Sequence, residues 1–168
     1  MSVRNATVAD AKEIAQINIA GWKRAYRGLL ADELIDSLSI EEGIPRQQAI
    51  LSPSSEDYFV FEEEGKVLWF CVFGSSRLEE FPQVDCELLA IYVEPSEKGR
   101  GIGRQLIQAT LEELNKRGKK TMLVQVLAEN HPSVAFYKKL GGVEVGRTKF
   151  AEKYPQFVLA FDIEESEK

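Results

Sequence analysis

Short apolar runs separated by turn-forming residues dominate the middle of the chain. Runs of this kind, bounded by glycine, proline or acidic residues, are typical of buried strands and occur at 58–61, 67–73 and 86–93. The first two flank the turn Glu62-Glu63-Glu64-Gly65 and therefore predict an antiparallel hairpin. By the same criteria we expect four further strands, at 3–7, 121–127, 143–148 and 157–163.

Helical periodicity appears in the remaining segments. Thr7 and Asp10 resemble a capping box that starts a helix ending at Gly28. A strong helical apolar pattern starts at Gly103, and Arg117-Gly118 gives that helix a cationic last turn and a terminal glycine. We expect one or two short helices at 29–39 and 40–51, interrupted at Pro45, and another at 133–140.

The order of these elements predicts one α/β domain. A hairpin-connected half precedes a strand-helix-strand crossover, which must be parallel and right-handed. We therefore expect a central mixed sheet of six to seven strands, with helices on both faces, in a single domain over residues 1–168. The Glu-rich last few residues predict a disordered tail.

The composition of the chain argues against several classes of binding partner. The net charge of −6 argues against nucleic-acid binding, which needs a clustered basic face. Apolar runs are too short to span a membrane and the N-terminus lacks a secretory segment, so we expect a cytoplasmic protein with no membrane partner. The single histidine, His131, excludes multi-histidine metal sites, and we expect no metal. Cys71 and Cys86 lie in apolar strands and are interpreted as reduced core thiols.

A glycine-rich loop joins strand 86–93 to the strongest predicted helix. Gly99, Gly101 and Gly103 let the backbone approach an anion while free amides at the helix N-terminus point towards it. The nearby cations either reach phosphate oxygens or stay solvated; they are Lys98, Arg100 and Arg104.

Two nucleotide-binding motifs do not fit this loop. A P-loop needs Lys and Ser or Thr directly after its last glycine, and Gly103 is followed by Arg104. A dinucleotide fingerprint read from Gly99 or Gly101 meets Arg104 or Leu106 where its third glycine belongs. The spacing therefore favours a different phosphate-binding loop.

The loop Lys98-Gly-Arg-Gly101-Ile-Gly103 resembles the Arg/Gln-x-x-Gly-x-Gly/Ala motif of the GCN5-related N-acetyltransferase (GNAT) family. Lysine replaces the usual first residue, a mild departure because the rest of the motif acts through backbone amides. Downstream, Asn130 and the run Ala135-Phe136-Tyr137, with Leu140-Gly141, are similar to a second signature of that family. Two motifs in the right order are more specific than either alone, and the resemblance extends over nearly the whole chain.

This resemblance implies a GNAT-like three-layer fold whose central sheet is splayed, with acetyl-CoA as co-substrate. In the family, the pantetheine arm of the coenzyme pairs with the strand before the loop. The resemblance implies the following cofactor-binding residues: Ile91, Tyr92, Val93, Lys98, Gly99, Arg100, Gly101, Ile102, Gly103, Arg104, Asn130 and Tyr137. Asn130 also has an ordinary interpretation as a helix cap.

Two residues are candidate catalysts. Glu87 stands in an otherwise apolar strand, and the resemblance places a carboxylate base there; the alternative is an exposed glutamate at a sheet edge. A tyrosine phenol stays protonated near neutral pH, so Tyr137 can serve as the general acid that the family carries at this position, or can be a core aromatic. A backbone N–H near Ile91 is the candidate oxyanion donor. Trp22 and Tyr26 either wall the acceptor pocket or pack in the core.

The sequence thus predicts an acetyl-CoA-dependent N-acetyltransferase that transfers the acetyl group directly to a primary amine of a small molecule or peptide. Two alternatives stay open: transfer of a longer acyl chain, and a CoA-binding regulatory module without turnover. A dimer is common among similar proteins, and the oligomeric state stays open.

Overall fold

The computed structural model describes residues 2–51, 54–76, 78–84, 86–93, 99 and 101–163. The chain folds into two compact units, which are Met1–Val72 with Ala90–Ile107 and Phe73–Leu89 with Gln108–Lys168. Strand β3 (Lys66–Ser75), strand β4 (Cys86–Val93) and helix α4 (Ile102–Lys116) each contribute residues to both units.

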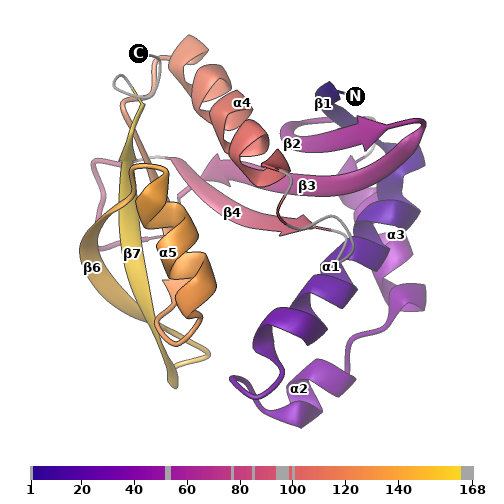
Figure 1. Cartoon of the computed structure of the whole chain (residues 1–168), viewed down its shortest axis with the longest axis horizontal. Helices are drawn as coiled ribbons and strands as arrows, with labels where there is room; N and C mark the ends of the chain where they lie inside the picture. Colours follow the sequence, from indigo (N-terminus) through magenta and orange to yellow (C-terminus); the bar gives the residue numbers. More distant parts are fainter. Residues whose placement is uncertain are drawn as a thin grey trace. The chain divides into compact units, whose positions relative to one another are not determined.

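Strand β1 (Ser2–Thr7) and strand β2 (Ser54–Glu63) pair antiparallel in the first unit, and β2 continues into the predicted hairpin with β3 (Figure 1). The turn consists of Glu64 and Gly65, which both have positive φ, at 53° and 78°. Two central residues with positive φ match the right-handed twist of the strands, so the turn sets the register of the hairpin.

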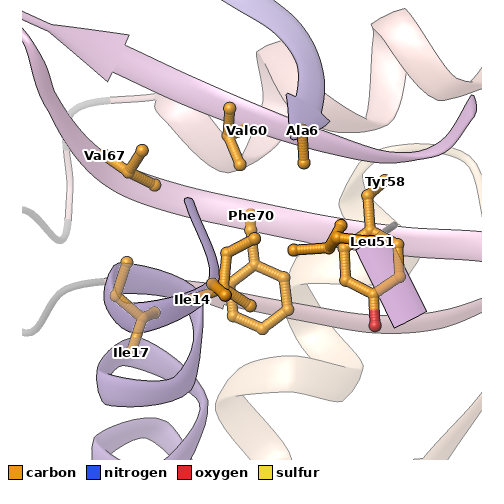
Figure 2. Close-up of a cluster of buried hydrophobic side chains, with 9 residues drawn as sticks. Ala6, Ile14, Ile17, Leu51, Tyr58, Val60, Val67 and Phe70 are labelled. Atoms are coloured by element: carbon orange, nitrogen blue, oxygen red, sulfur yellow. The ribbon is translucent and has the colours of Figure 1, made fainter. Parts of the chain in front are cut away.

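Helix α1 (Ala11–Tyr26) and helix α3 (Ile40–Leu51) belong to the same unit. Figure 2 shows Ile14 of α1 beside Phe70 of β3 and Leu51 of α3 beside Tyr58 of β2, and Ile17 of α1 belongs to the same cluster. These side chains are at most 7% exposed, and each fully buried apolar side chain stabilises the fold by about 1.5–3 kcal/mol. The apolar stripe that predicted α1 is therefore the face that forms this core.

The entry to α1 is fixed by the predicted capping box. A short 3₁₀ turn (Val8–Asp10) precedes the helix, and the Thr7 amide donates a 2.8 Å hydrogen bond to the Asp10 carboxylate. The Arg4 guanidinium binds the same carboxylate through two hydrogen bonds, of 2.8 and 2.9 Å. These bonds hold the pKa of Asp10 below its usual range, the bond from Arg4 contributing most.

The predicted interruption at Pro45 is wrong, because α3 is continuous through this residue. A proline in a helix removes the hydrogen bond to the carbonyl four residues earlier, here that of Glu41. Glu41 is exposed, so water can satisfy that carbonyl. Between α1 and α3 lies the short helix α2 (Asp32–Asp36).

The second unit contains strand β5 (Thr121–Leu127), helix α5 (His131–Lys139), strand β6 (Val143–Phe150) and strand β7 (Tyr154–Asp162). Strand β7 pairs antiparallel with both β5 and β6. Strand β4 pairs with β5 in parallel through Glu87 and Leu88, opposite Leu123 and Val124. This is the parallel pairing that the strand-helix-strand crossover predicted.

The seven strands hydrogen-bond in the order β1-β2-β3-β4-β5-β7-β6. The prediction of a mixed sheet of six to seven strands is thus confirmed. Cys71 and Cys86 are buried as expected, and the Cys86 thiol donates to the Thr121 carbonyl at 2.9 Å. Within the described ranges, no helix combines the length and apolarity needed to cross a bilayer, and no three His, Cys, Asp or Glu side chains gather as a metal site.

Candidate functional site

The glycine loop leads directly into helix α4 in the first unit. Gly99 and Gly101 have φ of 85° and 76°, in the left-handed region that favours glycine. The helix begins at Ile102, and the Gln105 amide is the donor to the Gly101 carbonyl. The amides of the first helical turn and the positive end of a 15-residue helix make this a suitable place for an anion.

The side chains of this loop divide into two kinds. Ile102 and Gly103 are buried and fix the start of α4, whereas Arg104 is exposed. An exposed guanidinium at a helix N-terminus can reach a phosphate oxygen without a cost of desolvation. Lys98 and Arg100 lie outside the described residues, and their predicted role in cofactor binding stays a prediction.

Tyr92, near the end of β4, lies against helix α1 within the first unit. A Cβ added at Gly21 would lie 2.6 Å from Cδ1 of Tyr92, so only glycine allows the ring to come this close. The ring also contacts Phe70, with centroids 5.8 Å apart. Ile91 is partly buried beside it, and the strand ends at Val93.

The predicted acceptor residues join this group. The rings of Trp22 and Tyr26 meet edge to face with centroids 4.8 Å apart, and Tyr26 shares a side-chain hydrogen bond with Tyr92. Burial raises the pKa of Tyr26, and the hydrogen bond from Tyr92 offsets part of that rise. The structure therefore links both predicted acceptor residues to a predicted cofactor-binding residue through one aromatic cluster.

Glu87 lies in the second unit, on a central strand, and is only 3% exposed. The alternative of an exposed glutamate at a sheet edge is therefore wrong. Its Oε2 accepts a 3.0 Å hydrogen bond from Nε2 of Gln125, and its Oε1 lies 3.5 Å from Oγ of Ser76. A buried carboxylate is costly unless hydrogen bonds replace its hydration, and Gln125 and Ser76 contribute to that here.

The hydrogen bonds extend beyond Gln125 across the sheet. The Thr148 hydroxyl on β6 donates to Oε1 of Gln125 at 2.8 Å and lies 3.3 Å from Oε1 of Gln156 on β7. Strand register explains the alignment, because Gln125 pairs with Val158 and Thr148 pairs with Gln156, two residues before Val158 on the same face of β7. A row of polar side chains thus crosses from β4 to β6 on one face.

Tyr137 packs on the other face of these strands. It is 8% exposed, and its ring meets Phe161 of β7 edge to face, with centroids 6.4 Å apart. Phe161 pairs with Met122, whereas Glu87 pairs with Leu123, the next residue of β5. Because successive residues of a strand point to opposite faces, the two candidate catalysts approach the sheet from opposite sides.

Gly142 explains how α5 comes so near β7. A Cβ at this position would lie 3.0 Å from the Tyr137 carbonyl and 3.2 Å from the Phe161 ring. The Gly142 amide donates to that same carbonyl at 2.9 Å. These contacts fix the turn of α5 that carries Tyr137.

Asn130 caps α5, because its Oδ1 accepts a 3.4 Å hydrogen bond from the Ser133 amide. The ordinary interpretation as a cap is therefore confirmed, and contact with the cofactor stays a prediction. His131 is exposed at the first position of the helix.

Several residues around Glu87 and Tyr92 were not identified from the sequence. Gln125 interrupts the apolar run of β5, as Glu87 interrupts that of β4, so this signal was present. Gly21 interrupts a helical pattern, which indicates a close approach of another group. Thr148 and Gln156 carried no comparable signal, because only the pairing of strands brings them to Gln125. Ser76, in the connection after β3, carried none either.

Comparison with known proteins identifies the family. The model of the acetyltransferase (GNAT) family matches residues 22–142. An uncharacterised N-acetyltransferase of Bacillus subtilis, YuaI, is 31% identical over 89% of this chain and 84% of its own length. The [ribosomal protein bS18]-alanine N-acetyltransferase of Escherichia coli is 32% identical over 56% of this chain and 68% of its own.

Solved structures share the fold. The PaiA N-acetyltransferase of Thermoplasma acidophilum, solved with coenzyme A, superimposes with a TM-score of 0.75 and 19% identity, covering 96% of this chain and 98% of its own. A putative acetyltransferase of Salmonella typhimurium, YncA, solved with acetyl-CoA, superimposes with a TM-score of 0.69 and 22% identity. The match covers 97% of this chain and 94% of YncA. The family model and the Bacillus relative each span most of the sequence, so this chain is an N-acetyltransferase that belongs to the acetyltransferase (GNAT) family.

Proposed function

We propose that this N-acetyltransferase uses acetyl-CoA and transfers its acetyl group directly to a primary amine of a small molecule or peptide. The single observation that carries the proposal is the pair of left-handed glycines, Gly99 and Gly101, immediately before the N-terminus of α4. That arrangement suits a pyrophosphate, since backbone amides supply the hydrogen bonds and the helix supplies partial positive charge. Its sequence is the one that resembles the family's coenzyme A loop.

The donor half of the site consists of the loop and the end of β4. In this proposal Gly99–Arg104 bind the pyrophosphate, with Lys98 and Asn130 as further contacts, and the backbone of Ile91, Tyr92 and Val93 pairs with the pantetheine arm. The exposed side chain of Arg104 and the exposed glycines support this assignment, because a charged ligand can reach them. Bound acetyl-CoA supplies an acetyl group activated as a thioester.

The acceptor must react as a neutral amine. A lysine-like amine has a pKa of about 10.4 and is mostly protonated at neutral pH, so a base accelerates the reaction. In our proposal Glu87 removes this proton, directly or through water, and a backbone N–H near Ile91 stabilises the charge that develops on the carbonyl oxygen. Trp22 and Tyr26 line the path of the acceptor.

Tyr137 provides the proton for the departing thiol. It packs on the face opposite Glu87, so in this proposal the two side chains act on different groups, Glu87 on the amine and Tyr137 on the sulfur. Transfer is direct, since Cys71 and Cys86 are buried in the interior and neither serves as a nucleophile in this scheme.

Release of free thiol from acetyl-CoA, measured across a panel of amines, tests this function. The panel includes peptides with free N-termini and small amines, and we expect turnover with at least one of them. Turnover only with longer acyl-CoA thioesters would favour the first alternative. Thermal stabilisation by acetyl-CoA without thiol release from any acceptor would favour a regulatory module. Sedimentation and cell fractionation test the further proposals of a homodimer and a cytoplasmic location.

A further inference from the structure

We propose that Gln125 and Thr148 are positioning residues that hold the Glu87 carboxylate in the orientation needed for proton transfer. This inference rests on the proposed role of Glu87 as base. It concerns residues on three strands of the second unit, which the family motifs do not include. Neither residue is proposed to touch the substrate.

The contacts place Gln125 as a close partner of the carboxylate. Its Nε2 lies 3.0 Å from Oε2 of Glu87, a normal hydrogen-bond length, whereas Ser76 lies 3.5 Å from Oε1. With Glu87 only 3% exposed, bulk water does not compete strongly for this bond. Fixing Oε2 restricts rotation of the carboxylate and so sets the direction of Oε1.

The amide of Gln125 could in principle turn by 180°, because its oxygen and nitrogen have almost the same size. An ionised carboxylate only accepts hydrogen bonds, so the turned amide would place two acceptors 3.0 Å apart. The carboxylate therefore sets the orientation of the amide, and the Thr148 hydroxyl, which donates to Oε1 of Gln125 at 2.8 Å, holds the amide from the other side. The two contacts together keep the donor of Gln125 directed at Glu87.

Gln156 completes the row. Thr148 has one hydroxyl proton, and the 2.8 Å bond to Gln125 uses it. The 3.3 Å contact with Gln156 is therefore best satisfied when the Gln156 amide nitrogen donates to Thr148. All donors in the row then point towards Glu87, and hydrogen bonds aligned in this way strengthen one another.

The β3–β4 connection shields the same face. Gly146 pairs with Val158, which also pairs with Gln125, so Gly146 lies on the face of the polar row, two residues before Thr148. Phe81 packs directly on it, since a Cβ at Gly146 would lie 2.9 Å from Cζ of Phe81. An aromatic ring at this place limits water beside Thr148 and favours its bond with Gln125.

The substitutions Thr148→Val and Thr148→Ser form the decisive pair. Valine keeps the shape and loses the hydroxyl, whereas serine keeps the hydroxyl. We expect Thr148→Val to lower kcat about 10-fold and Gln125→Leu to lower it about 50-fold, because the base is misplaced and no longer oriented. Thr148→Ser should stay within about 2-fold of the wild type, with the KM for acetyl-CoA unchanged in all three. Val145→Thr, at an exposed position of β6, is the control and should leave kcat unchanged.

Side-chain amide signals of Gln125 in a ¹⁵N NMR spectrum report the row independently of turnover. Gln125→Leu assigns them, and we expect them to move in Thr148→Val and to stay in Thr148→Ser. Wild-type kcat in Thr148→Val, with Glu87→Gln impaired, would overturn the positioning role and leave the proposed function intact. A different outcome is that the wild-type protein turns over no amine while the amide signals still shift in Thr148→Val as expected. That outcome would show that the proposed function had failed, and the catalytic role of the row with it.

Discussion

The glycine loop before α4 and the polar row around Glu87 achieve their geometry by different means. The loop depends on backbone conformation, since Gly99 and Gly101 adopt left-handed angles and the helix amides follow directly in sequence. The row depends on side chains that come from separate strands and meet through strand register. One is a local structure, whereas the other exists only in the folded sheet.

This difference has a consequence for tolerance to mutation. Backbone hydrogen bonds survive most side-chain changes, so the loop should be sensitive mainly to residues that cannot adopt positive φ. A row of side chains is sensitive to the loss of a polar atom, because the buried Glu87 carboxylate then has fewer or less well-oriented donors. Gly101→Val breaks the loop side of this contrast, and the smaller substitutions after it test other contacts of the site and the fold.

The largest effect is expected for Gly101→Val. A β-branched residue is strongly disfavoured at φ of 76°, although the space around this position is open, so the loop must change its conformation. We expect the Kd for acetyl-CoA to rise about 100-fold, which corresponds to about 2.7 kcal/mol, as measured by titration calorimetry. Gly118→Val is the matched control, with φ of 78° at the other end of α4; it should lower Tm and leave the Kd within about 2-fold. Equal losses of affinity in both variants would contradict the role of the loop.

Tyr137→Phe should remove the proton donor while keeping the ring that packs against Phe161. We expect kcat to fall about 30-fold, or about 2 kcal/mol, with an unchanged Kd for acetyl-CoA. Tyr154→Phe on β7 controls for the loss of a tyrosine hydroxyl and should keep full activity. Unchanged turnover in Tyr137→Phe would exclude the tyrosine as general acid.

Gly21→Ala tests the contact between α1 and β4. The added methyl group would lie 2.6 Å from Tyr92, so the ring must shift, at a cost of about 1–2 kcal/mol in the free energy of unfolding. Gly43→Ala in α3 is the control, because its Cβ would be at an ordinary 3.4 Å from Ala15 and alanine favours a helix. Chemical denaturation should separate the two variants; similar stability would mean that Tyr92 adapts without cost.

The smallest effect is expected for Asp10→Asn, which breaks the ionic part of the capping box. The folded-state pKa of Asp10 is lowered, so its contribution is complete above the unfolded value of 3.8 and is lost as pH falls through the folded-state value. We expect the variant to lose about 1 kcal/mol at pH 7, a modest figure because Arg4 is 34% exposed. The difference from wild type in the free energy of unfolding should shrink below about pH 4. A difference independent of pH would indicate that the charge of Asp10 is unimportant.

The sequence predicts local structures better than contacts between distant strands, which is the same contrast as between the loop and the row. Strands β4 and β5 begin and end where the apolar pattern predicted, and α4 begins one residue before the expected start. These features depend on residues adjacent in sequence. The continuity of α3 through Pro45 was not predicted, because it depends on the exposure of a neighbouring carbonyl rather than on helix propensity.

The sequence points to a candidate site residue where one residue or one motif carries the signal. Glu87 stood out as an acid among apolar residues, and its burial confirms that it is exceptional. Its partners did not stand out, since 38 residues separate it from Gln125 and only the order of strands brings them together. The glycine at position 21 indicates that another group approaches α1 closely, but the sequence does not show that this group is the ring of Tyr92.

The burial of both cysteines gives the protein a built-in indicator of its folded state. Cys71 is 0% exposed and Cys86 is 2% exposed, so a colorimetric thiol reagent should leave them unmodified while the fold is intact. The same reagent reacts at once with any coenzyme thiol set free in solution. A slow second phase of colour would then mark opening of the interior, and a single sample would show both chemistry and unfolding on separate timescales.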